Sequence, residues 1–401
     1  MKNSKKHTQK IRKQIIGLIS GTSSDGIDAA LVDIEAQGHE RKVDLKAFET
    51  YAYPKKIRSK ILELAHAEKI ILDELCSFQI ILGDLFGDAA LAIAKKAKVP
   101  LSQIDLIGSH GQTIRHLPPT ASFNRGMSFQ IAEAAMIVCK TKVTTVSDFR
   151  VNDMAWGGHG APLTPYLHYY LFHQVGYGVA IQNIGGMSNV TVIPSNASLK
   201  DVVAFDTGPG NALIDAMVSH ATRGKKQFDA DGAMAAKGKV QTLFLNKLLK
   251  HPFFFKKPPK STGREEFGVV FAKHILSLAK GMSMEDLIAT VTALTAHSIS
   301  ENYFRFVFPK TKIREIILGG GGAKNKTLVH FLKRCMPMIS HKRFEDYGYN
   351  SSAIEAMAFA LLAFETSQGT CANLPEVTGA QREVVLGKVT PGANFRSICL
   401  K

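Results

Sequence analysis

The chain has 401 residues, of which 45% are hydrophobic and 21% are charged, and its formal net charge is +16. This length favours two lobes over one simple core, and the composition is that of a globular protein rather than a disordered one. No run of about 18 apolar residues occurs, which argues against a membrane-spanning segment. The lysines are scattered without a nucleic-acid-binding motif, so solvated faces together with a site for an anionic substrate explain the positive charge better than nucleic-acid binding.

The five cysteines are isolated from one another, and no CxxC pair occurs. This argues against structural zinc and against a redox dithiol, and free thiols in a reducing cytoplasm are the simplest interpretation. Residues 1–16 are interpreted as a basic extension before the first strand and not as a signal peptide, because few apolar residues follow the charged ones. Composition leaves the oligomeric state open, with a homodimer among the alternatives.

The first predicted strand, Ile15–Ile19, is separated from a second, Ile27–Ile34, by a polar turn with a glycine at each end. The turn reads Gly21-Thr22-Ser23-Ser24-Asp25-Gly26. Glycine allows a backbone to approach an anion closely, and N–H groups and hydroxyls can bind one. An anion-binding loop and an ordinary surface hairpin both fit this stretch, which has neither Walker nor dinucleotide-binding spacing.

A third strand is predicted at Val43–Ala52, and the sequence from Pro54 to Ala97 is mostly helical in pattern. The next buried strand, Ile104–Gly108, runs into the polar segment Ser109-His110-Gly111-Gln112-Thr113. A helix at Gln130–Lys140 and a strand at Val143–Val146 precede Asp148-Phe149-Arg150. Polar residues therefore follow two buried strands.

The opening pattern then recurs about 165 residues later, with strands at Val179–Ile184 and Val190–Ile193 around a Gly185-Gly186 turn. Two strand–glycine turn–strand units suggest a duplicated domain. A further strand, Val202–Phe205, ends in Asp206-Thr207-Gly208-Pro209-Gly210-Asn211, just before a predicted helix whose N-terminus could favour phosphate. The carboxylate of Asp206 can either face a cleft from this rigid element or cap the helix.

Strand Glu315–Leu318 ends in Gly319-Gly320-Gly321-Gly322, and Glu355 lies in an otherwise apolar predicted helix, Ser352–Phe364. The segment Phe253–Pro259 is the best candidate for a mobile connection. Four strand ends therefore carry glycine-rich loops, and this pattern predicts an α/β protein in which two lobes face a nucleotide triphosphate.

Eight segments in chain order resemble the 1,6-anhydro-N-acetylmuramic acid kinases: GLISGTSSDGIDAAL, IGSHGQTIRH, DFRVNDMAWGGHGAPL, QNIGGMSNV, FDTGPGNALID, FDADGAMA, PKSTGREEF and LGGGGAKN. The resemblance runs from about Gly17 to Leu386. It implies the actin/Hsp70/sugar-kinase superfamily, with two ribonuclease-H-like lobes around an ATP cleft. It places lobe I at 17–134 plus 348–401 and lobe II at 135–347, and lobe II holds the second glycine turn, the catalytic Asp and the adenosine loop.

The implied reaction uses ATP, Mg²⁺ and water to open the anhydro ring and to phosphorylate O6. Its products are N-acetylmuramic acid 6-phosphate and ADP, in the recycling of cell-wall muropeptides by a cytoplasmic enzyme. The competing interpretations are a non-catalytic nucleotide-binding switch of the same superfamily and a nucleic-acid-binding protein. The chain departs from the family's common pattern at His159, where Gln is usual.

The resemblance assigns roles to individual residues. The phosphate-binding and adenosine-binding residues are Gly21, Thr22, Ser23, Ser24, Asp25, Gly26, Ile27, Asp28, Gly185, Gly186, Gly208, Gly210, Gly320 and Gly321. Asp25 either reaches Mg²⁺ or caps its own turn. Asp206 is the general base that activates water, and Glu355 helps to hold sugar or water. His110, Gln112, Thr113 and Arg150 form the sugar side. Arg150 either pairs with the lactyl carboxylate or makes a structural ion pair.

Overall fold

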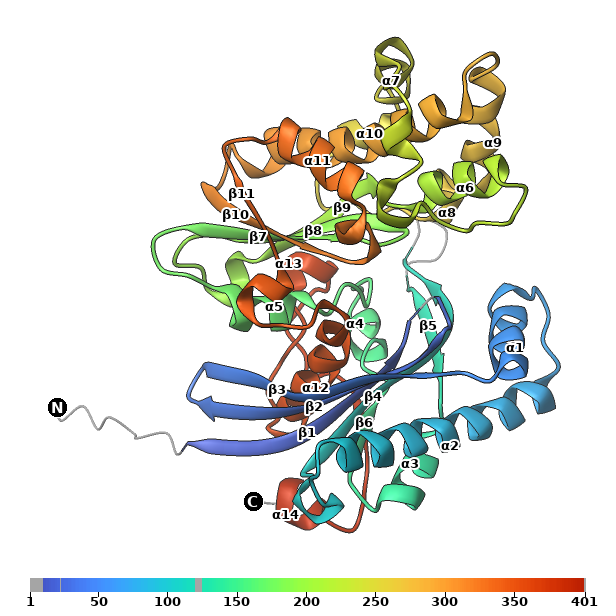
Figure 1. The fold of residues 1–401 in the computed structure, drawn as a ribbon. Helices are drawn as coiled ribbons and strands as arrows, with labels where there is room; N and C mark the ends of the chain where they lie inside the picture. The colour runs from blue at the N-terminus through green and yellow to red at the C-terminus, as the bar shows by residue number, and fades with distance from the viewer. Residues whose placement is uncertain (1–9, 22, 120–124, 400–401) are drawn as a thin grey trace. The chain divides into compact units, whose positions relative to one another are not determined.

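The computed structural model describes residues 10–21, 23–119 and 125–399, and the chain divides into two compact units (Figure 1). Unit 1 consists of Met1–Leu171 together with Ser352–Lys401, and unit 2 is Phe172–Ser351. Unit 1 is therefore built from two segments that are far apart in the sequence, and unit 2 is continuous.

Unit 1 contains a seven-stranded mixed sheet with the order β12-β6-β4-β1-β2-β3, and β5 pairs with β4. Its strands are β1 (Ile11–Ser20), β2 (Gly26–Gln37), β3 (Glu40–Ala52), β4 (Leu106–Leu117), β5 (Met127–Ile131), β6 (Thr145–Ser147) and β12 (Lys388–Thr390). Strands β1, β2 and β3 form an antiparallel meander, whereas β4 runs parallel to β1 and β6 runs parallel to β4. The hairpin predicted at the start of the chain is confirmed.

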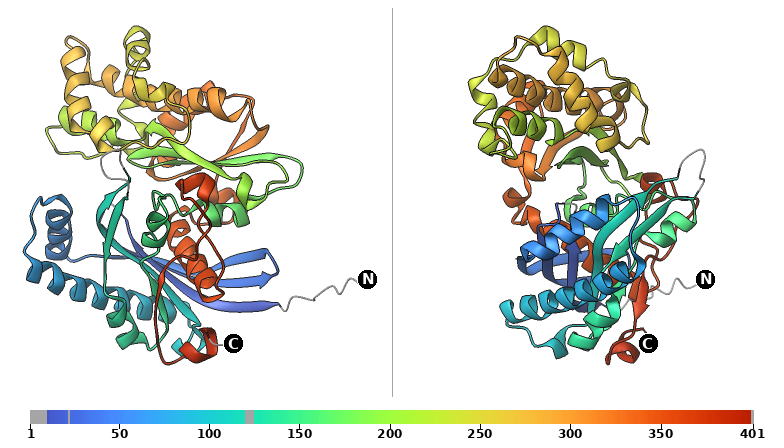
Figure 2. Two further views of the ribbon diagram at one scale, coloured as in Figure 1. Left: turned by 180° about the vertical axis from the view of Figure 1, so that it is seen from behind. Right: turned by 90° about the vertical axis from the view of Figure 1, so that its right-hand side faces the viewer.

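Helices cover both faces of this sheet (Figures 1 and 2). The helices of unit 1 are α1 (Lys55–His66), α2 (Leu72–Lys96), α3 (Ala134–Thr141), α4 (Val151–Ala155), α5 (Pro165–Phe172, which crosses the unit boundary), α12 (Ile354–Ser367), α13 (Pro375–Thr378) and α14 (Phe395–Cys399). Ile16 and Leu18 of β1 share a core with α2, while α12 packs on the other face. Gly17, between them, faces α12 because side chains alternate along a strand. A Cβ on Gly17 would lie 1.8 Å from the carbonyl oxygen of Ala356, so glycine is required for this close approach.

Unit 2 contains a five-stranded sheet with the order β11-β10-β7-β8-β9. The strands are β7 (Gly178–Ile184), β8 (Met187–Ile193), β9 (Val203–Pro209), β10 (Ile313–Gly319) and β11 (Ser340–Arg343). The helices are α6 (Ala212–Ala221), α7 (Thr242–Leu248), α8 (Arg264–Phe267), α9 (Val269–Leu278), α10 (Met284–Asn302) and α11 (Lys326–Cys335). Helix α10 is mostly buried and contacts β9, α6, α7 and α11.

The two sheets have the same topology. In each unit an antiparallel meander of three strands is extended, beside its first strand, by two parallel strands. The predicted duplication is thereby confirmed, together with the α/β class and the ribonuclease-H-like order that the resemblance implied for each lobe.

Helix α2, with 25 residues, is long and largely apolar. Within the described residues it is the one helix that could cross a membrane, judged by length and composition alone. Its side chains Phe78, Leu82, Phe86 and Ile93 are buried in the core that it shares with the sheet of unit 1.

The structure differs from four expectations. Strand β1 begins at Ile11, so residues 11–16 belong to the first strand rather than to the extension expected at 1–16. The units divide at residues 171/172 and 351/352 rather than at 134/135 and 347/348, because β6 pairs with β4 and β12 pairs with β6 inside the sheet of unit 1. The helix expected from Gln130 starts at Ala134, since Gln130 pairs with Thr113 in the β4–β5 ladder. The segment expected to be mobile begins with Phe253 and Phe254, which are buried in the core of unit 2.

Candidate active site

The turn between β1 and β2 is closed by a hydrogen bond from the N–H of Ser24 to the carbonyl of Gly21 (3.0 Å), with Ser24 at a φ of 53°. Ser23 is exposed, and Thr22 lies outside the described residues. Asp25 is largely exposed and forms an ion pair with Arg58 of α1 (2.8 Å). A cation bound by Asp25 would therefore have to compete with Arg58.

Ile27 and Asp28 belong to β2 rather than to the turn. The side chain of Ile27 is buried in the core, so only its main chain can face a ligand. Asp28 points to the opposite face and accepts a hydrogen bond from the hydroxyl of Thr50 (2.5 Å). Burial raises the pKa of Asp28, the hydrogen bond from Thr50 opposes this rise, and the charge of Asp25 adds to it.

Gln112 connects the end of β1 to the polar part of β4. Its side-chain oxygen accepts a hydrogen bond from the hydroxyl of Ser20 (2.5 Å), and its amide lies 3.5 Å from the carbonyl oxygen of Gly21. Thr113 accepts a hydrogen bond from the amide of Gln130 on β5 (3.2 Å). Gln112 thus ties the start of the first turn to β4, while Thr113 is used within the sheet.

Arg150 and His110 are held together in unit 1. The Nε–H of Arg150 donates to Nε2 of His110 (2.9 Å), and Nη1 donates to the carbonyl of Gly160 (2.7 Å). Because Nε2 accepts, the proton of His110 lies on Nδ1, which donates to the carbonyl of Gly111 (3.0 Å). Burial holds the pKa of His110 well below its usual value, and the charge of Arg150 adds to this effect. His110 is a neutral partner that orients the guanidinium.

Glu355 lies in the first turn of α12. Its side chain reaches solvent, yet surrounding protein atoms desolvate the carboxylate and raise its pKa, an effect that Arg150 opposes and Asp28 increases. Burial also lowers the pKa of Arg150 to about 10, while Glu355 acts in the opposite direction. Asp28, Arg150 and Glu355 are therefore close enough to influence one another electrostatically.

Asp206 lies within β9, the edge strand of the sheet in unit 2. Its N–H donates to the carbonyl of Lys260 (3.0 Å), and its Oδ2 accepts a hydrogen bond from the N–H of Thr262 (2.8 Å). Oδ1 accepts no hydrogen bond from the described residues. Burial raises the pKa of Asp206 to about 6, although the Thr262 hydrogen bond lowers it. A half-buried carboxylate with one oxygen fixed and one available suits a general base near neutral pH.

The glycine loops of unit 2 meet at the start of α6. The carbonyl of Gly185 accepts a hydrogen bond from the N–H of Asn211 (2.8 Å), and the carbonyl of Gly186 accepts one from the N–H of Gly210 (2.9 Å). Gly320 packs on Ile184, since its Cβ would lie 2.7 Å from that carbonyl oxygen. The structure therefore brings together the predicted residues of three loops. It also shows that the N–H groups of Gly210, Asn211 and Ala212, at the N-terminus of α6, are already satisfied by the protein.

Seven of the eight predicted glycines fall into two groups, and at the eighth, Gly185, a Cβ would make an ordinary contact 3.5 Å from the carbonyl oxygen of Met187. At Gly26, Gly208, Gly210 and Gly320, an added Cβ would lie within 3.0 Å of protein atoms, so packing alone explains the absence of a side chain. At Gly21, Gly186 and Gly321, a Cβ would meet no atom of the described chain closer than 3.7 Å, and none of the three has a positive φ. For these three, neither packing nor backbone conformation requires glycine.

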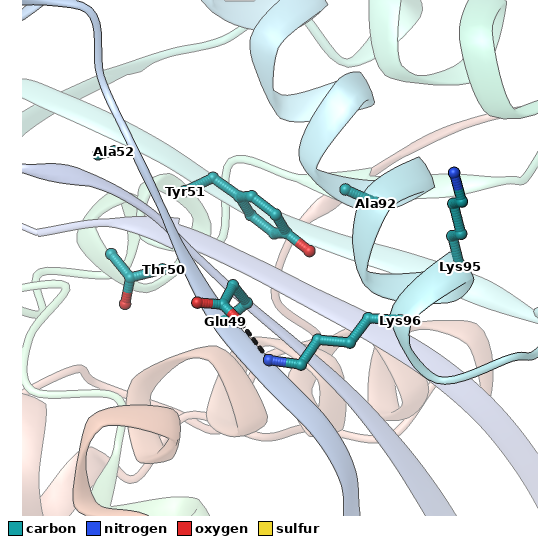
Figure 3. Close-up of a pocket in the computed structure, with 7 residues that line it drawn as sticks. All are labelled: Glu49, Thr50, Tyr51, Ala52, Ala92, Lys95 and Lys96. Carbon is teal, nitrogen blue, oxygen red and sulfur yellow. Dashed lines mark hydrogen bonds and ion pairs between the residues drawn. The ribbon is translucent and has the colours of Figure 1, made fainter.

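Two other observations concern binding sites. Within the described residues, no group of three or more His, Cys, Asp and Glu side chains is arranged to hold a metal ion. An open hollow of about 620 Å³ lies beside β3 and the end of α2 in unit 1 (Figure 3), lined by Glu49, Thr50, Tyr51, Ala52, Ala92, Lys95 and Lys96. None of the predicted site residues lines this hollow.

Several residues that contact the predicted ones were not expected from the sequence. Thr50 binds Asp28, Ser20 binds Gln112, and Lys260 with Thr262 binds Asp206. For the last pair a signal was present, because the polar, conformationally permissive segment PKSTG is unusual between two aromatic-rich stretches. For Thr50 and Ser20 no signal distinguishes them from other strand hydroxyls.

Comparison with known proteins agrees with the residue patterns. The family model for anhydro-N-acetylmuramic acid kinase matches residues 13–392. A relative of that name from Caldanaerobacter subterraneus is 46% identical over 386 residues, covering 95% of this chain and 98% of the relative. Another from Clostridioides difficile is 41% identical over 376 residues, covering 94% and 98%. The chain belongs to the anhydro-N-acetylmuramic acid kinase family, which confirms the predicted family and the predicted class of enzyme.

Solved structures are more distant. The activator of the 2-hydroxyisocaproyl-CoA dehydratase from Clostridium difficile, with bound ADPNP, is 14% identical with a TM-score of 0.42, covering 88% of this chain and 94% of that one. A ROK hexokinase from Thermus thermophilus is 12% identical with a TM-score of 0.34, covering 87% and 99%.

Proposed function

We propose that the enzyme converts 1,6-anhydro-N-acetylmuramic acid, ATP and water into N-acetylmuramic acid 6-phosphate and ADP. The sugar and the kinase activity are those in the name of its relatives. In a 1,6-anhydro sugar, O6 is a bridging ether oxygen without a proton, so it cannot simply be deprotonated and phosphorylated. Water must open the bridge. Such a product would serve the recycling of cell-wall sugars.

The observation that carries this proposal is the state of Asp206. Its carboxylate has one oxygen fixed by Thr262, and its pKa is raised to about 6 by burial. In the proposed step, Asp206 accepts a proton from water while the water oxygen bonds to C1 and the C1–O6 bond breaks. The freed O6 then attacks the γ-phosphorus of ATP, and the bond between that phosphorus and the bridging oxygen breaks to release ADP.

For unit 1 we propose that Arg150, oriented by neutral His110, binds an anionic or hydroxyl group of the sugar. Two of its nitrogens are already used by His110 and Gly160, so the guanidinium direction is fixed before substrate arrives. Glu355, whose pKa is raised, is suited to accept or share a hydrogen bond from a sugar hydroxyl or water. Gln112 is assigned a supporting role, because it holds the Gly21 end of the first turn.

Phosphate binding is assigned to the glycines whose side-chain space the protein leaves open: Gly21, Gly186 and Gly321. Mg²⁺ neutralises phosphate charge when it is bound with a nucleotide. The oxygen donors of the first hairpin, Asp25, Asp28 and Ser23, are chemically suited to such a hard cation. Of these, Asp28 is the stronger candidate, because Asp25 is engaged by Arg58.

Mass spectrometry of a reaction with ATP, Mg²⁺ and 1,6-anhydro-N-acetylmuramic acid tests the proposal. The expected product is heavier than the sugar by one phosphoryl group and one water. In ¹⁸O-labelled water, the label should enter at C1 and be absent from the phosphate. A product heavier by the phosphoryl group alone, or ADP released without any sugar product, would refute the proposed reaction.

A further inference from the structure

The edge strand β9 is paired along its free side by a segment outside the sheet. The main chain of Lys260 accepts a hydrogen bond from the N–H of Asp206 (3.0 Å), and Thr262 donates to the carboxylate (2.8 Å). The hydroxyl of Thr262 in turn donates to Glu266 of α8 (2.9 Å). The segment Lys260–Thr262 therefore holds the backbone and the carboxylate of Asp206 at the same time.

The side chain of Lys260 fastens this segment to the core. Its ammonium lies 4.7 Å from the ring centroid of Phe253 and 4.9 Å from that of Phe306. It also donates to the carbonyl of Phe253 (3.3 Å), whose own ring is fully buried. An ammonium over two aromatic faces is stabilised electrostatically, more strongly where it is partly desolvated. The cation is therefore held in one place next to the strand that carries Asp206.

We propose that Lys260 is a positioning residue for Asp206: its cage of two aromatic rings anchors the segment that fixes the carboxylate, and its charge favours the anionic form that can accept a proton. This inference rests on the proposed role of Asp206 as the general base. In this role the side chain of Lys260 need not touch the reacting atoms.

The surrounding charges determine the direction in which the pKa of Asp206 is shifted. The charge of Lys260 lowers the pKa of Asp206, whereas Glu265 on α8 raises it. Burial lowers the pKa of Lys260 to about 8, so that it is mostly charged at neutral pH. The other groups that face Lys260 are Arg305 and Lys256, which lower its pKa, and Glu266, which raises it. Removing the Lys260 charge should therefore raise the pKa of Asp206 and reduce the fraction of active base in mildly acidic solution.

The experiment compares kcat/KM between pH 5 and pH 9 for the wild type and three variants. Lys260→Met removes the charge but keeps an apolar stem against the rings, Lys260→Arg keeps a cation, and Lys257→Met removes an exposed charge of the same segment. The acid limb of the pH profile is the fall in kcat/KM at low pH, where Asp206 becomes protonated. With Lys260→Met, the midpoint of this acid limb should move upward by roughly half a pH unit or more. Lys260→Arg should restore the wild-type midpoint, and Lys257→Met should leave it unchanged.

An unshifted acid limb in folded Lys260→Met would overturn the inference. So would a raised KM for ATP with an unchanged limb, because Lys260 would then contact the nucleotide. If Lys260→Met does not fold, Lys260→Arg decides alone, since an upward shift despite the retained cation contradicts the proposal. Asp206→Asn is measured in parallel. Retained activity in Asp206→Asn would refute the role of Asp206 as the general base. Lost activity in Asp206→Asn, together with an unshifted acid limb in Lys260→Met, would refute only the role of Lys260.

Discussion

Unit 1 and unit 2 share a strand order, yet they fasten the turn of their first hairpin in different ways. In unit 2, the carbonyl of Gly185 accepts a hydrogen bond from Asn211, which precedes α6, and that of Gly186 accepts one from Ala212, the first residue of α6, so this turn is tied to the N-terminus of a helix. In unit 1, the turn contacts the side chains of Arg58 and Gln112 instead. A repeated topology thus repeats the position of a turn, while the sequence decides which of its polar groups remain available to a ligand.

The cores of the units differ as well. Unit 1 contains a buried ion pair between Arg41 of β3 and Glu365 of α12 (2.7 Å), with side chains that are 8% and 0% exposed. Unit 2 instead groups the aromatic rings of Phe253, Phe254 and Phe267. The first arrangement depends on both charges being present, and the second depends on packed volume.

The largest expected effect concerns Asp206 of unit 2, the proposed general base. Asp206→Asn keeps the size of the side chain but cannot accept a proton, so kcat should fall by about 10²–10⁴-fold. ATP affinity should change little, and the melting temperature should not fall, since the amide oxygen can still accept the Thr262 hydrogen bond. Steady-state kinetics with calorimetric ATP binding check this. Near-wild-type kcat in a folded sample would make Glu355 the next carboxylate to examine.

The buried ion pair gives the second prediction. Arg41→Met leaves Glu365 buried without its cation, which should lower the free energy of unfolding by about 3–5 kcal/mol. The double variant Arg41→Met/Glu365→Met should recover most of that loss. Urea denaturation measures both, and Arg58→Met, which breaks an exposed pair with Asp25, is the matched control with an expected change below about 1 kcal/mol. Equal losses of unfolding free energy in Arg41→Met and Arg58→Met would contradict the expected difference between the buried and the exposed ion pair.

The third prediction separates packing from ligand approach within one hairpin. A Cβ on Gly26 would lie 2.4 Å from the carbonyl oxygen of Tyr51, so Gly26→Ala should destabilise the protein by about 1–3 kcal/mol. Gly21→Ala meets open space and should leave stability within about 0.5 kcal/mol. Its ATP affinity should nevertheless fall by roughly tenfold, because the methyl group occupies the proposed phosphate position. Unchanged ATP affinity in Gly21→Ala would remove this turn from the phosphate site.

The smallest effect is a pH dependence. The pKa of Asp206 is raised to about 6 by burial, so kcat/KM should rise with pH and level off above that value. The same shift affects stability with the opposite sign. Since the folded state binds this proton more tightly than the unfolded state, the contribution of Asp206 to stability increases as the pH falls from about 6 towards 4. Melting curves of wild type and Asp206→Asn between pH 7 and pH 4 should therefore diverge in favour of the wild type, and parallel curves would disprove the shift.

Local patterns were enough to predict the two hairpins, the helix after Asn211 and the family, because glycine turns and ordered motifs are encoded by neighbouring residues. The boundary between units was not predictable in this way. It depends on β6 and β12, short strands that pair across about 240 residues of sequence. The burial of Phe253 and Phe254 was missed for a similar reason, because the adjacent lysines and prolines resemble a surface connection.

The site was predictable as a set of residue types and not as a set of contacts. Asp206 and the glycines could be named from motifs, and the motif PKSTGREEF marked the segment of Lys260 and Thr262, but no motif indicated that this segment would pair with β9. Nor did the sequence show that Arg150 would use two of its nitrogens within unit 1. It also gave no means of separating Gly21 from Gly26, which differ only in what lies beside their Cα atoms.

The divided construction of unit 1 has a consequence for biosynthesis. The chain leaves the ribosome from its N-terminus, so β1, β2 and β4 are complete long before α12 exists. Until α12 emerges, Gly17 and Gly108 present a bare face of the sheet, since each is shaped to receive that helix at close range. Unit 2 is continuous, so all of it is synthesised before α12. The C-terminal segment, which is translated last, thus covers the sheet formed by the N-terminal segment, which is translated first. A nascent chain halted before residue 352 exposes an incomplete sheet that chaperones and proteases can recognise.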